Sequence, residues 1–526
     1  MYAGWRERIY LRLDSLRADV TICLMIKNLP AFIRALCEPG AYDHSVDTVE
    51  VVETHISWVL LAGQFAYKIK KPVRLVFLDF STLDLRHRYC LAELDLNKRF
   101  APDLYIEVVG IGEGSQGLRM YPTSEPIEYA IKMRRFDEAL RLDHVCERGE
   151  LTADHLSGLA RSLSKLYAKA LVAVAEQNAT HGSLDDIGRQ ALDNFVDPAK
   201  LLTDPKDQER LQSIRDWTLS QVKALTPLFL GRRAAGFVRE CHGDLHLGNL
   251  VLMDGQITAF DCIEFADDLR WIDVASDVAF LFVDLMARAQ FGLANWWLSE
   301  FLSQTGDYGA LPVLRFYAVY RAMVRLKVCC IRSAQTGLRE HEIETYLALA
   351  KQLMNASAIE LVITHGVSGC GKSWSAAAWI RQDRPDLRLR LRADVERKRL
   401  FGLAELAQTH SGPRQGIYAE TASRQTYAHL MSLSEQALRA GWSVVIDASF
   451  LKRQDRLFAE TLAQSVGVDW HILAPVAPLS QLQSRIRARQ AAGRDASEAD
   501  LAVLELQLQT MEPLTDAERA LVLDAY

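Results

Sequence analysis

A glycine-rich segment in the last third of the chain limits the folds that it can adopt. Residues 366–373 read GVSGCGKS and fit the Walker A pattern G-x-x-x-x-G-K-[ST]. The apolar run IELVITHG leads into this segment and the helix-forming stretch WSAAAWI follows it, which predicts a buried strand, a turn and a helix. Glycines in such a turn let the backbone wrap a phosphate, and the amides at the helix start face the anion. The segment therefore predicts a phosphate-binding loop, with a chance match to the pattern as the alternative.

Each part of this loop has an expected role toward ATP and Mg²⁺. Lys372 is expected to neutralise the β- and γ-phosphate oxygens, and the hydroxyl of Ser373 is expected to coordinate the metal. The other positions that we expect to contact the nucleotide are Gly366, Val367, Ser368, Gly369, Cys370 and Gly371. ATP and Mg²⁺ are therefore the predicted cofactors of this part of the chain.

Two carboxylates follow other strand-like runs in the same region. Asp447 ends the apolar run SVVI, where a second magnesium-side carboxylate belongs, and an Asp that merely caps a turn is the alternative. Asp394 follows the run LRLRLRA, and ligands of open α/β sheets bind at the carboxyl ends of strands. A carboxylate at that place can take the proton from an attacking hydroxyl. A plain helix N-cap is the other interpretation of Asp394.

The segment RIRARQAAGRD carries a further pair of candidate residues. Arg485 and Arg489 lie one helical turn apart, so they share a face of the predicted helix. In kinases with a mobile lid, such arginines stabilise the charge on the transferring phosphoryl group. An exposed, solvated helix produces the same pattern, and this alternative stays open.

Strand-like runs alternate with helical segments from residue 359 onward, which predicts a parallel α/β sheet. About residues 360–526 resemble the P-loop kinase family that includes zeta toxins, chloramphenicol phosphotransferase, gluconate kinase and polynucleotide 5′-kinase. The resemblance rests on the loop ending in GKS and on RADVERKRL, VVIDASF and RIRAR. It implies Asp394 as the catalytic base and ATP with Mg²⁺ as cofactors, but it implies no particular acceptor.

A second cluster of polar residues is the block HGDLHLGN, which is followed by two apolar runs. Asp244 and Asn249 can occupy one loop, with one side chain facing an acceptor hydroxyl and the other a metal. Asp254-Gly255 between the apolar runs predicts a hairpin, which returns the chain so that Asp261 lies beside Asn249. Two oxygen ligands on adjacent strand ends predict a Mg²⁺ site that also holds phosphate.

This arrangement resembles the aminoglycoside phosphotransferase and choline kinase branch of the protein-kinase-like fold, over about residues 45–335. Glycine follows histidine in HGD, as in those small-molecule kinases, where protein kinases usually have arginine. The resemblance implies Asp244 as the base, and Asn249 and Asp261 as magnesium ligands. It also implies that Asp273, in WIDVASD, supports the loop structurally.

The same resemblance implies a lysine on the third strand that anchors ATP and pairs with a glutamate on a helix. HISWVLLAG and QFAYKIK read as two strands around a turn at Gly63, and a helix is predicted over residues 82–100. Lys68 and Lys70 share one strand face, since side chains alternate along a strand. Lys68 is the preferred anchor and Glu93 its predicted partner, whereas a solvated strand lysine is the alternative.

The chain has 526 residues, more than one hydrophobic core usually organises, so two domains are expected. Met25 precedes the stretch in which the globular pattern begins, and one interpretation treats the residues before it as an extension. We predict a protein-kinase-like α+β domain followed by an α/β P-loop NTPase domain. The predicted boundaries are 1–340 for the first domain (small lobe about 45–137, helical lobe about 138–340), 341–358 for a connecting helix and 359–526 for the second domain.

Charge, cysteine content and apolar stretches indicate the cellular location of the protein and the kinds of partner that it has. The formal net charge of −6 argues against a protein that coats nucleic acid through bulk charge. Nine scattered cysteines, an odd number without metal-binding spacing, fit a reducing cytosol better than a disulfide framework. No apolar stretch reaches the roughly 18 residues of a membrane span. These features predict a cytoplasmic protein without a membrane partner, and they leave its oligomeric state open.

The fused pair resembles bacterial proteins that join an aminoglycoside-phosphotransferase-like domain to an ATP-binding domain. The leading hypothesis is a bifunctional kinase whose halves each transfer a γ-phosphoryl group to a hydroxyl of a small molecule or nucleotide. A second hypothesis makes the first half a ligand-sensing pseudokinase that regulates the other, because residues 54–65 hold one glycine instead of a glycine-rich phosphate loop. A third makes the P-loop half a nucleic-acid end kinase, because residues 381–399 hold eight basic and four acidic residues.

Overall fold

The computed structural model describes residues 29–75, 78–114, 117–173, 181–355, 358–409, 415–493 and 495–523. The extension suggested before Met25 lies outside these ranges. The chain forms two compact units. The first consists of Met1–Leu151, Leu166–Ile187 and Leu230–Asp277, and the second of Thr152–Lys165, Gly188–Phe229 and Val278–Tyr526.

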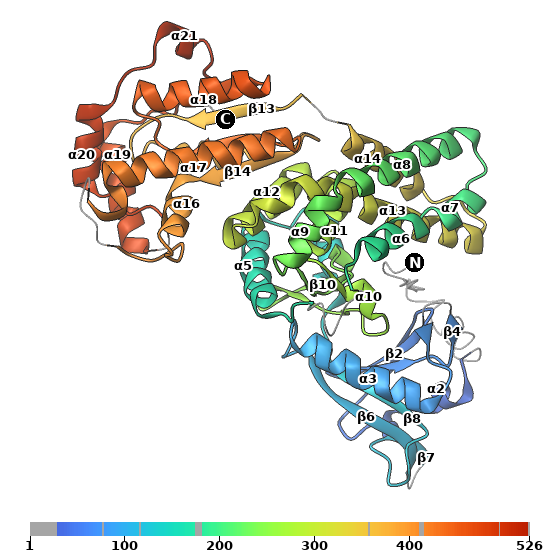
Figure 1. The fold of residues 1–526 in the computed structure, drawn as a ribbon. Helices are drawn as coiled ribbons and strands as arrows, with labels where there is room; N and C mark the ends of the chain where they lie inside the picture. The colour runs from blue at the N-terminus through green and yellow to red at the C-terminus, as the bar shows by residue number, and fades with distance from the viewer. Residues whose placement is uncertain are drawn as a thin grey trace. The chain divides into compact units, whose positions relative to one another are not determined.

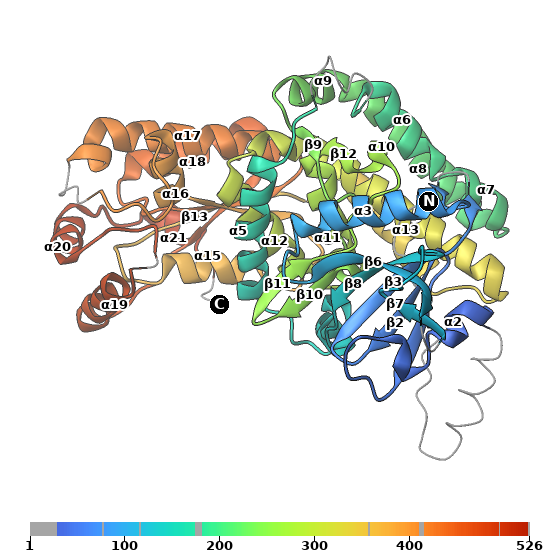
Figure 2. The same cartoon turned by 90° about the horizontal axis from the view of Figure 1, so that it is seen from below.

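The first unit is built around a six-stranded antiparallel sheet in the order β1-β2-β3-β8-β6-β7 (Figure 1). Helix α3 (Leu83–Lys98) packs against β6 and β8 (Figure 2), and Thr82 caps it by accepting a hydrogen bond from the backbone N–H of Leu85. The predicted strands around Gly63 and the helix over residues 82–100 are thereby confirmed. The strands are β1 (Val49–Glu53), β2 (Ser57–Ala62), β3 (Phe65–Lys70), β6 (Tyr105–Gly114), β7 (Gly117–Met120) and β8 (Glu128–Arg134).

A tight hairpin follows the HGDLHLGN block in the same unit. Strands β10 (Leu250–Met253) and β11 (Gln256–Ala259) pair in antiparallel fashion. Their turn residues Asp254 and Gly255 have φ angles of 50° and 76°, the left-handed conformation that a two-residue Asp-Gly turn requires. The predicted hairpin is confirmed. The remaining elements of this unit are α2 (Ala31–Ala35), η1 (Pro39–Ala41), β4 (Arg74–Leu75), β5 (Leu78–Asp79), η2 (Glu138–Leu140), α4 (Leu142–Glu147), β9 (Val238–Glu240), η3 (Leu247–Asn249), α10 (Asp267–Arg270) and β12 (Trp271–Asp273).

The second unit begins with helices that share an apolar core. Helix α13 (Leu311–Thr336) is the longest of the described helices and packs against α7 (Val196–Leu201), α8 (Pro205–Ala224) and α14 (Glu342–Met354). Most of its residues from Leu311 to Cys330 are buried. The further helical elements are α12 (Phe291–Thr305) and η4 (Tyr308–Ala310), together with α5 (Ala153–Lys169), α6 (Leu184–Asp193), α9 (Thr226–Ala234) and α11 (Val274–Ala287), which contribute residues to both units.

A four-stranded parallel sheet in the order β14-β15-β13-β16 completes the second unit. Helices α15, α17 and α18 pack against its strands, and α12 lies beside the edge strand β14 (Figure 1). The predicted parallel α/β sheet is confirmed. The strands are β13 (Glu360–Thr364), β14 (Arg388–Arg392), β15 (Ser443–Asp447) and β16 (Asp469–Leu473), and the helices are α15 (Lys372–Ile380), α16 (Ala393–Leu400), η5 (Gly416–Tyr418), α17 (Glu420–Arg439), α18 (Arg453–Val466), α19 (Leu479–Ala492), α20 (Leu501–Thr510) and α21 (Asp516–Arg519).

Two features bear on the predicted location of the protein, namely the character of its helices and the state of its cysteines. Among the helices that the structure describes, none combines the length and the apolar character needed to cross a bilayer. The eight cysteines within the described ranges are all free thiols, and all of them except Cys37 are buried.

Candidate active sites

The phosphate loop connects β13 to α15 in the second unit. Gly369 and Gly371 have φ angles of 83° and 110°, a backbone conformation that favours glycine. A Cβ atom at Gly369 would lie 2.8 Å from the carbonyl oxygen of Leu482, so no side chain fits there. Helix α15 begins at Lys372, directly after the last of these glycines. The strand, glycine turn and helix that the sequence predicts are all present.

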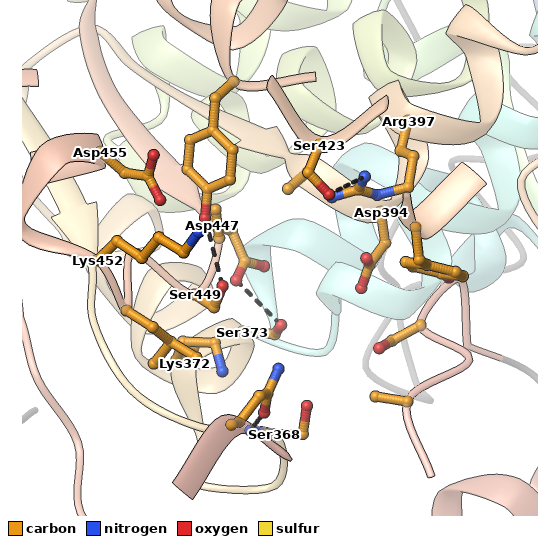
Figure 3. A pocket seen from close by; sticks show the side chains of 18 of the residues that line it. Ser368, Lys372, Ser373, Asp394, Arg397, Ser423, Asp447, Ser449, Lys452 and Asp455 are labelled. Atoms are coloured by element: carbon orange, nitrogen blue, oxygen red, sulfur yellow. Dashed lines mark hydrogen bonds between the residues drawn. The ribbon is translucent and has the colours of Figure 1, made fainter. Parts of the chain in front are cut away.

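The loop borders a cavity of about 1290 Å³. Nζ of Lys372 donates a hydrogen bond to the carbonyl oxygen of Val367 at 2.8 Å, and Oγ of Ser373 donates to Oδ1 of Asp447 at 3.1 Å. Figure 3 shows the side chains of Lys372, Ser373 and Asp447 around this space. The predicted loop residues that line the cavity are Ser368, Gly369, Gly371, Lys372 and Ser373, whereas Gly366, Val367 and Cys370 are buried.

Asp447 is the last residue of β15, which lies next to β13 in the sheet. Its Oδ2 accepts hydrogen bonds from Nε of Arg390, at 3.1 Å, and from Nη2 of the same arginine. Burial by itself raises the pKa of Asp447, but the Arg390 guanidinium outweighs burial and holds this pKa below its ordinary value. Asp447 is therefore an ionised carboxylate at neutral pH, with one oxygen toward the phosphate loop and the other toward Arg390.

Asp394 is the second residue of α16, which follows β14 directly. The N-cap of this helix is Arg392, so Asp394 does not have the plain capping role that was the alternative. Within the described ranges, no hydrogen bond or ion pair engages its carboxylate. Its half-buried side chain lines the cavity that the phosphate loop borders (Figure 3). The structure thus brings Asp394, Ser373 and Asp447 to one space from three different strand ends.

The two predicted lid arginines lie on α19 and line the same cavity. Nη1 of Arg485 donates a hydrogen bond to the carbonyl oxygen of Gly369 at 3.1 Å, in the phosphate loop itself. Nη2 of Arg489 donates to the carbonyl oxygen of Ala499 at 2.7 Å. Arg485 therefore touches the loop, whereas Arg489 is held by the segment that follows the helix.

The cavity has a wall that sequence reasoning missed. Arg397 on α16 is buried, and its Nη1 donates to the carbonyl oxygen of Ile417 at 3.0 Å and to Oγ of Ser423 at 3.3 Å. Its guanidinium lies 5.2 Å from the ring centre of Tyr418. The one available signal was spacing, because a residue three positions after Asp394 shares its helix face. Other residues that line the cavity are Arg424, Tyr427, Lys452 and Asp455.

In the first unit, the HGD loop (residues 242–249) brings its polar side chains together. Nδ2 of Asn249 donates hydrogen bonds to Oδ2 of Asp244 at 2.8 Å and to the carbonyl oxygen of Asp244 at 3.0 Å. Nε2 of His246 lies 3.4 Å from the same Oδ2. Asp244 and Asn249 are both buried. The structure thus places Asp244 and Asn249 in one loop, as predicted.

The hairpin after the HGD loop returns the chain to it, as expected. The backbone N–H of Phe260 donates to the carbonyl oxygen of Asn249 at 2.9 Å, which places the next residue, Asp261, beside that strand end. Asp261 has a φ angle of 66°, a strained conformation for a residue other than glycine. His242 adds a contact to the carbonyl oxygen of Phe260 at 3.0 Å. The HGD loop and the Asp261 segment therefore form one connected structure.

Two lysines of β3 and three carboxylates form a network beside this structure. Nζ of Lys68 lies 2.6 Å from both Oε1 of Glu93 and Oδ1 of Asp261. Lys70 is 1% exposed, and its Nζ contacts Oε2 of Glu93 at 2.6 Å and a carboxylate oxygen of Glu264. Burial raises the pKa of Glu93, but the two ammonium groups outweigh it and the pKa stays below its ordinary value. Neither lysine is the solvated strand residue of the alternative interpretation, and Lys68 is the one that reaches Asp261.

One expectation about the HGD loop is wrong. Asp273 does not support the loop; its carboxylate accepts from Nε and Nη2 of Arg232 at 2.7 and 2.8 Å. Asp277, four residues later, accepts from the backbone N–H groups of His242 (2.8 Å) and Gly243 (3.1 Å) and from Oη of Tyr167 (2.6 Å). Because β12 ends at Asp273 and α11 begins at the next residue, it is the first turn of this helix that faces the loop.

The connection between β1 and β2 is a short turn over residues 54–57. Oγ1 of Thr54 accepts a hydrogen bond from the backbone N–H of Ser57 at 2.9 Å, and the backbone N–H of Thr54 donates to the carbonyl oxygen of Ser57 at 2.8 Å. The sequence has no glycine-rich phosphate loop at this place, and the hydroxyl of Thr54 closes the short turn that connects the two strands.

Comparison with known proteins finds two family matches along the chain. Residues 146–317 match the family described as phosphotransferase enzyme family, and residues 361–514 match the family described as AAA domain. The chain joins these two kinds of segment. The first match contains Asp244, Asn249 and Asp261, and the second contains the phosphate loop. The predicted resemblance and the two-domain fold class are confirmed, and a phosphotransferase is supported.

Curated relatives and solved structures are similar to the chain to a limited degree. Uncharacterized proteins of Mycobacterium bovis and Mycobacterium tuberculosis are each 28% identical over 457 residues, which cover 85% of this chain and 88% of theirs. A choline/ethanolamine kinase family protein from Mesorhizobium loti is 12% identical, covering 62% of this chain and 94% of that chain, with a TM-score of 0.39. The Mycobacterium tuberculosis APS kinase in complex with AMPPNP and APS is 20% identical, covering 26% and 72%, with a TM-score of 0.21.

Proposed function

We propose that the chain is a bifunctional ATP-dependent phosphotransferase, in which each half transfers a γ-phosphoryl group to a hydroxyl of a small molecule or nucleotide. The observation that carries the proposal is the cavity in which Lys372, the Ser373–Asp447 pair and Asp394 meet. It combines a phosphate-binding cation, oxygen ligands and an unbonded carboxylate, the set that phosphoryl transfer needs. The HGD loop with Lys68 supplies an analogous set in the first unit.

The ligand sets fit Mg²⁺ held jointly with phosphate. Each candidate site offers two oxygen-bearing side chains, Asn249 and Asp261 in one unit and Ser373 and Asp447 in the other. Across the ranges that the structure describes, no group of three or more His, Cys, Asp or Glu side chains is arranged to hold a metal without help. Mg²⁺ is commonly bound by one or two carboxylates plus substrate phosphates, so two protein ligands suffice. The bound metal would supply charge neutralisation to the β- and γ-phosphates.

In the proposed reaction of the second unit, Lys372 and the loop amides bind the phosphates. Asp394 accepts the proton of the attacking acceptor hydroxyl, because its carboxylate faces the cavity and takes part in no hydrogen bond with any residue that the structure describes. Arg485 and Arg489 then stabilise the charge that develops on the transferring group. A hydroxyl-bearing acceptor would lie between the phosphate loop and the wall that contains Arg397.

In the first unit, Lys68 would anchor the phosphates while Glu93 orients it. Asp244 would accept the proton of the acceptor hydroxyl, and its Oδ2 is held by Asn249. The boundaries 1–340, 341–358 and 359–526 stay part of this proposal; α14 (Glu342–Met354) and β13, which starts at Glu360, support the position of the connecting helix. The cytoplasmic location also stays a prediction.

The test uses the full chain, radiolabelled ATP and a panel of metabolites and oligonucleotides. Two variants, Asp244→Asn and Lys372→Ala, are compared with the unchanged protein. We expect acceptors of two classes, one lost with each variant, because the proposal assigns the two residues to separate reactions. If the full chain takes up no ATP in the presence of Mg²⁺ by calorimetry, the proposal is wrong.

A ligand-sensing pseudokinase in the first unit is the second candidate. The observations that favour it are the short Thr54–Ser57 turn and the ion pair of Lys68 with Asp261, which engages the proposed phosphate anchor and a proposed magnesium ligand with each other. Under this hypothesis every phosphorylated acceptor depends on Lys372 and none responds to Asp244→Asn. The same panel therefore separates the two candidates.

The nucleic-acid end kinase loses much of its sequence support. Four of the eight basic residues in 381–399 are buried: Arg388, Arg390, Arg397 and Lys398. Three of these contact a carboxylate, and Arg397 contacts a carbonyl oxygen. Half of the basic residues in this run are therefore used inside the fold, which weakens its interpretation as a surface patch for a polyphosphate. Steep salt dependence of oligonucleotide binding would still revive this candidate.

A further inference from the structure

Strand β14 has an unusual sequence for a buried parallel strand. It reads RLRLR over Arg388–Arg392, and alternation along a strand places its three arginines on one face. Strands of parallel sheets are covered on both faces and are usually apolar throughout. Burying a guanidinium is costly unless it is paired and hydrogen-bonded. The position of each of the three arginines on this strand therefore requires compensating contacts.

The outer two arginines are explained by neighbours away from the phosphate loop. Nη1 of Arg388 donates to the carbonyl oxygen of Trp379 at 2.7 Å and to Oε1 of Gln382 at 2.6 Å. Nη1 of Arg392 contacts Oε1 of Glu405 at 2.7 Å. These contacts tie β14 to α15 and to the segment after α16.

Arg390, the middle arginine, instead meets the carboxylate of the phosphate-loop site. It is 7% exposed, and two of its nitrogens donate to Oδ2 of Asp447. The other oxygen of Asp447, Oδ1, accepts from Ser373 in the phosphate loop. The two oxygens of Asp447 thus have separate partners, and the two donors of the planar guanidinium converge on Oδ2, a geometry that a lysine ammonium does not reproduce.

The strand that carries Arg390 is itself held in place. β14 is an edge strand, and α12 covers its free backbone groups. Oγ of Ser299 accepts from the backbone N–H of Arg390 at 3.2 Å, and Oδ1 of Asn295 accepts from that of Arg388 at 3.2 Å. Both side chains are buried on α12. Arg390 therefore projects from a rigid element, as a residue that orients a ligand group must.

We propose that Arg390 is a positioning residue of the phosphate-loop site in the second unit, called the second site below. Arg390 holds Asp447 so that Oδ1 of Asp447 stays available beside Ser373. The inference rests on the proposed function, because it concerns how the Mg²⁺-side carboxylate is oriented. It predicts a selective defect. Binding of ATP without metal depends on Lys372 and the loop amides and should persist, whereas the gain in affinity from Mg²⁺ should fall when Asp447 is free to turn.

The test is calorimetry of ATP binding to the full chain, with Mg²⁺ and with a chelator. The binding event that Lys372→Ala removes identifies the second site. In Arg390→Met, we expect the Mg²⁺-dependent affinity to fall by about 10- to 100-fold, the usual effect of removing a residue that orients a metal ligand. The affinity in chelator should stay unchanged, because the phosphate loop itself is not altered. Arg388→Met is the matched control, since it removes a buried arginine from the same face of the same strand.

The possible results distinguish a failure of the proposed function from a failure of the positioning role of Arg390. If no ATP binds to the unchanged protein, the proposed function is wrong. If ATP binds but Arg390→Met and Arg388→Met behave alike, the positioning role is wrong. Should Arg390→Met fail to fold, Arg390→Lys keeps the charge but not the two-donor geometry and should show a smaller, still selective, loss. In a double variant with Asp447→Asn, Arg390→Lys should cause no further loss, and additive losses would overturn the inference.

Discussion

Replacing Asp277 with alanine tests how the HGD loop is held. Asp277 accepts hydrogen bonds from the backbone N–H groups of His242 and Gly243 and from Tyr167. A buried donor that loses its acceptor costs about 1–3 kcal/mol, so three such losses sum to about 3–9 kcal/mol. Truncation makes room for water, and we therefore expect a loss of about 3–5 kcal/mol in the free energy that protects this loop.

Hydrogen exchange measured by mass spectrometry reads this loss directly at the loop. A loss of 3 kcal/mol corresponds to roughly a hundredfold faster exchange, since each 1.4 kcal/mol is about a factor of ten. Peptides that cover residues 242–249 should show this acceleration in Asp277→Ala. Asp273→Ala is the control, because it breaks the buried pair with Arg232 and leaves the three hydrogen bonds to Asp277 in place. Unchanged loop exchange in Asp277→Ala, with acceleration in Asp273→Ala instead, would refute the reasoning.

Three further predictions address the other clusters. Asp394→Asn should lower the turnover of second-site acceptors by about 10²- to 10⁴-fold and leave ATP affinity unchanged, as removal of a general base does; equal loss of ATP affinity in calorimetry would contradict this. Lys70→Met leaves Glu93 and Glu264 buried without their shared cation, so urea denaturation should show a loss of about 3–5 kcal/mol, and an unchanged midpoint would count against it. Burial raises the pKa of the Cys90 thiol to about 12, so iodoacetamide at pH 9 should label this residue only in denatured protein. The Cys90 thiol loses its proton at a lower pH in the unfolded chain than in the folded one, so its ionisation favours unfolding increasingly as pH rises above about 8.5. Labelling of Cys90 in the native protein at pH 9 would disprove the raised pKa.

Local sequence patterns predicted the parts of both sites that are local in the chain. The phosphate loop is a strand, a glycine turn and a helix in direct succession, so each residue's role follows from its immediate neighbours. The Asp254-Gly255 turn likewise follows from two residues and placed Asp261 beside Asn249. Strand alternation was enough to put Lys68 and Lys70 on one face. It could not tell which lysine reaches Asp261, because that depends on a contact across 193 positions of sequence.

Tertiary packing decided which polar groups serve the sites and which support the fold. The resemblance pointed to Asp273 in WIDVASD, but the junction between β12 and α11 turns Asp277 toward the HGD loop. By its sequence the basic run around Arg390 suggested a contact with a nucleic acid, yet the sheet buries Arg390 against Asp447, which lies 57 positions away. Spacing along the chain reveals side chains that share a face of one element. It does not reveal which element covers that face, because burial and ion pairing arise only when distant segments meet.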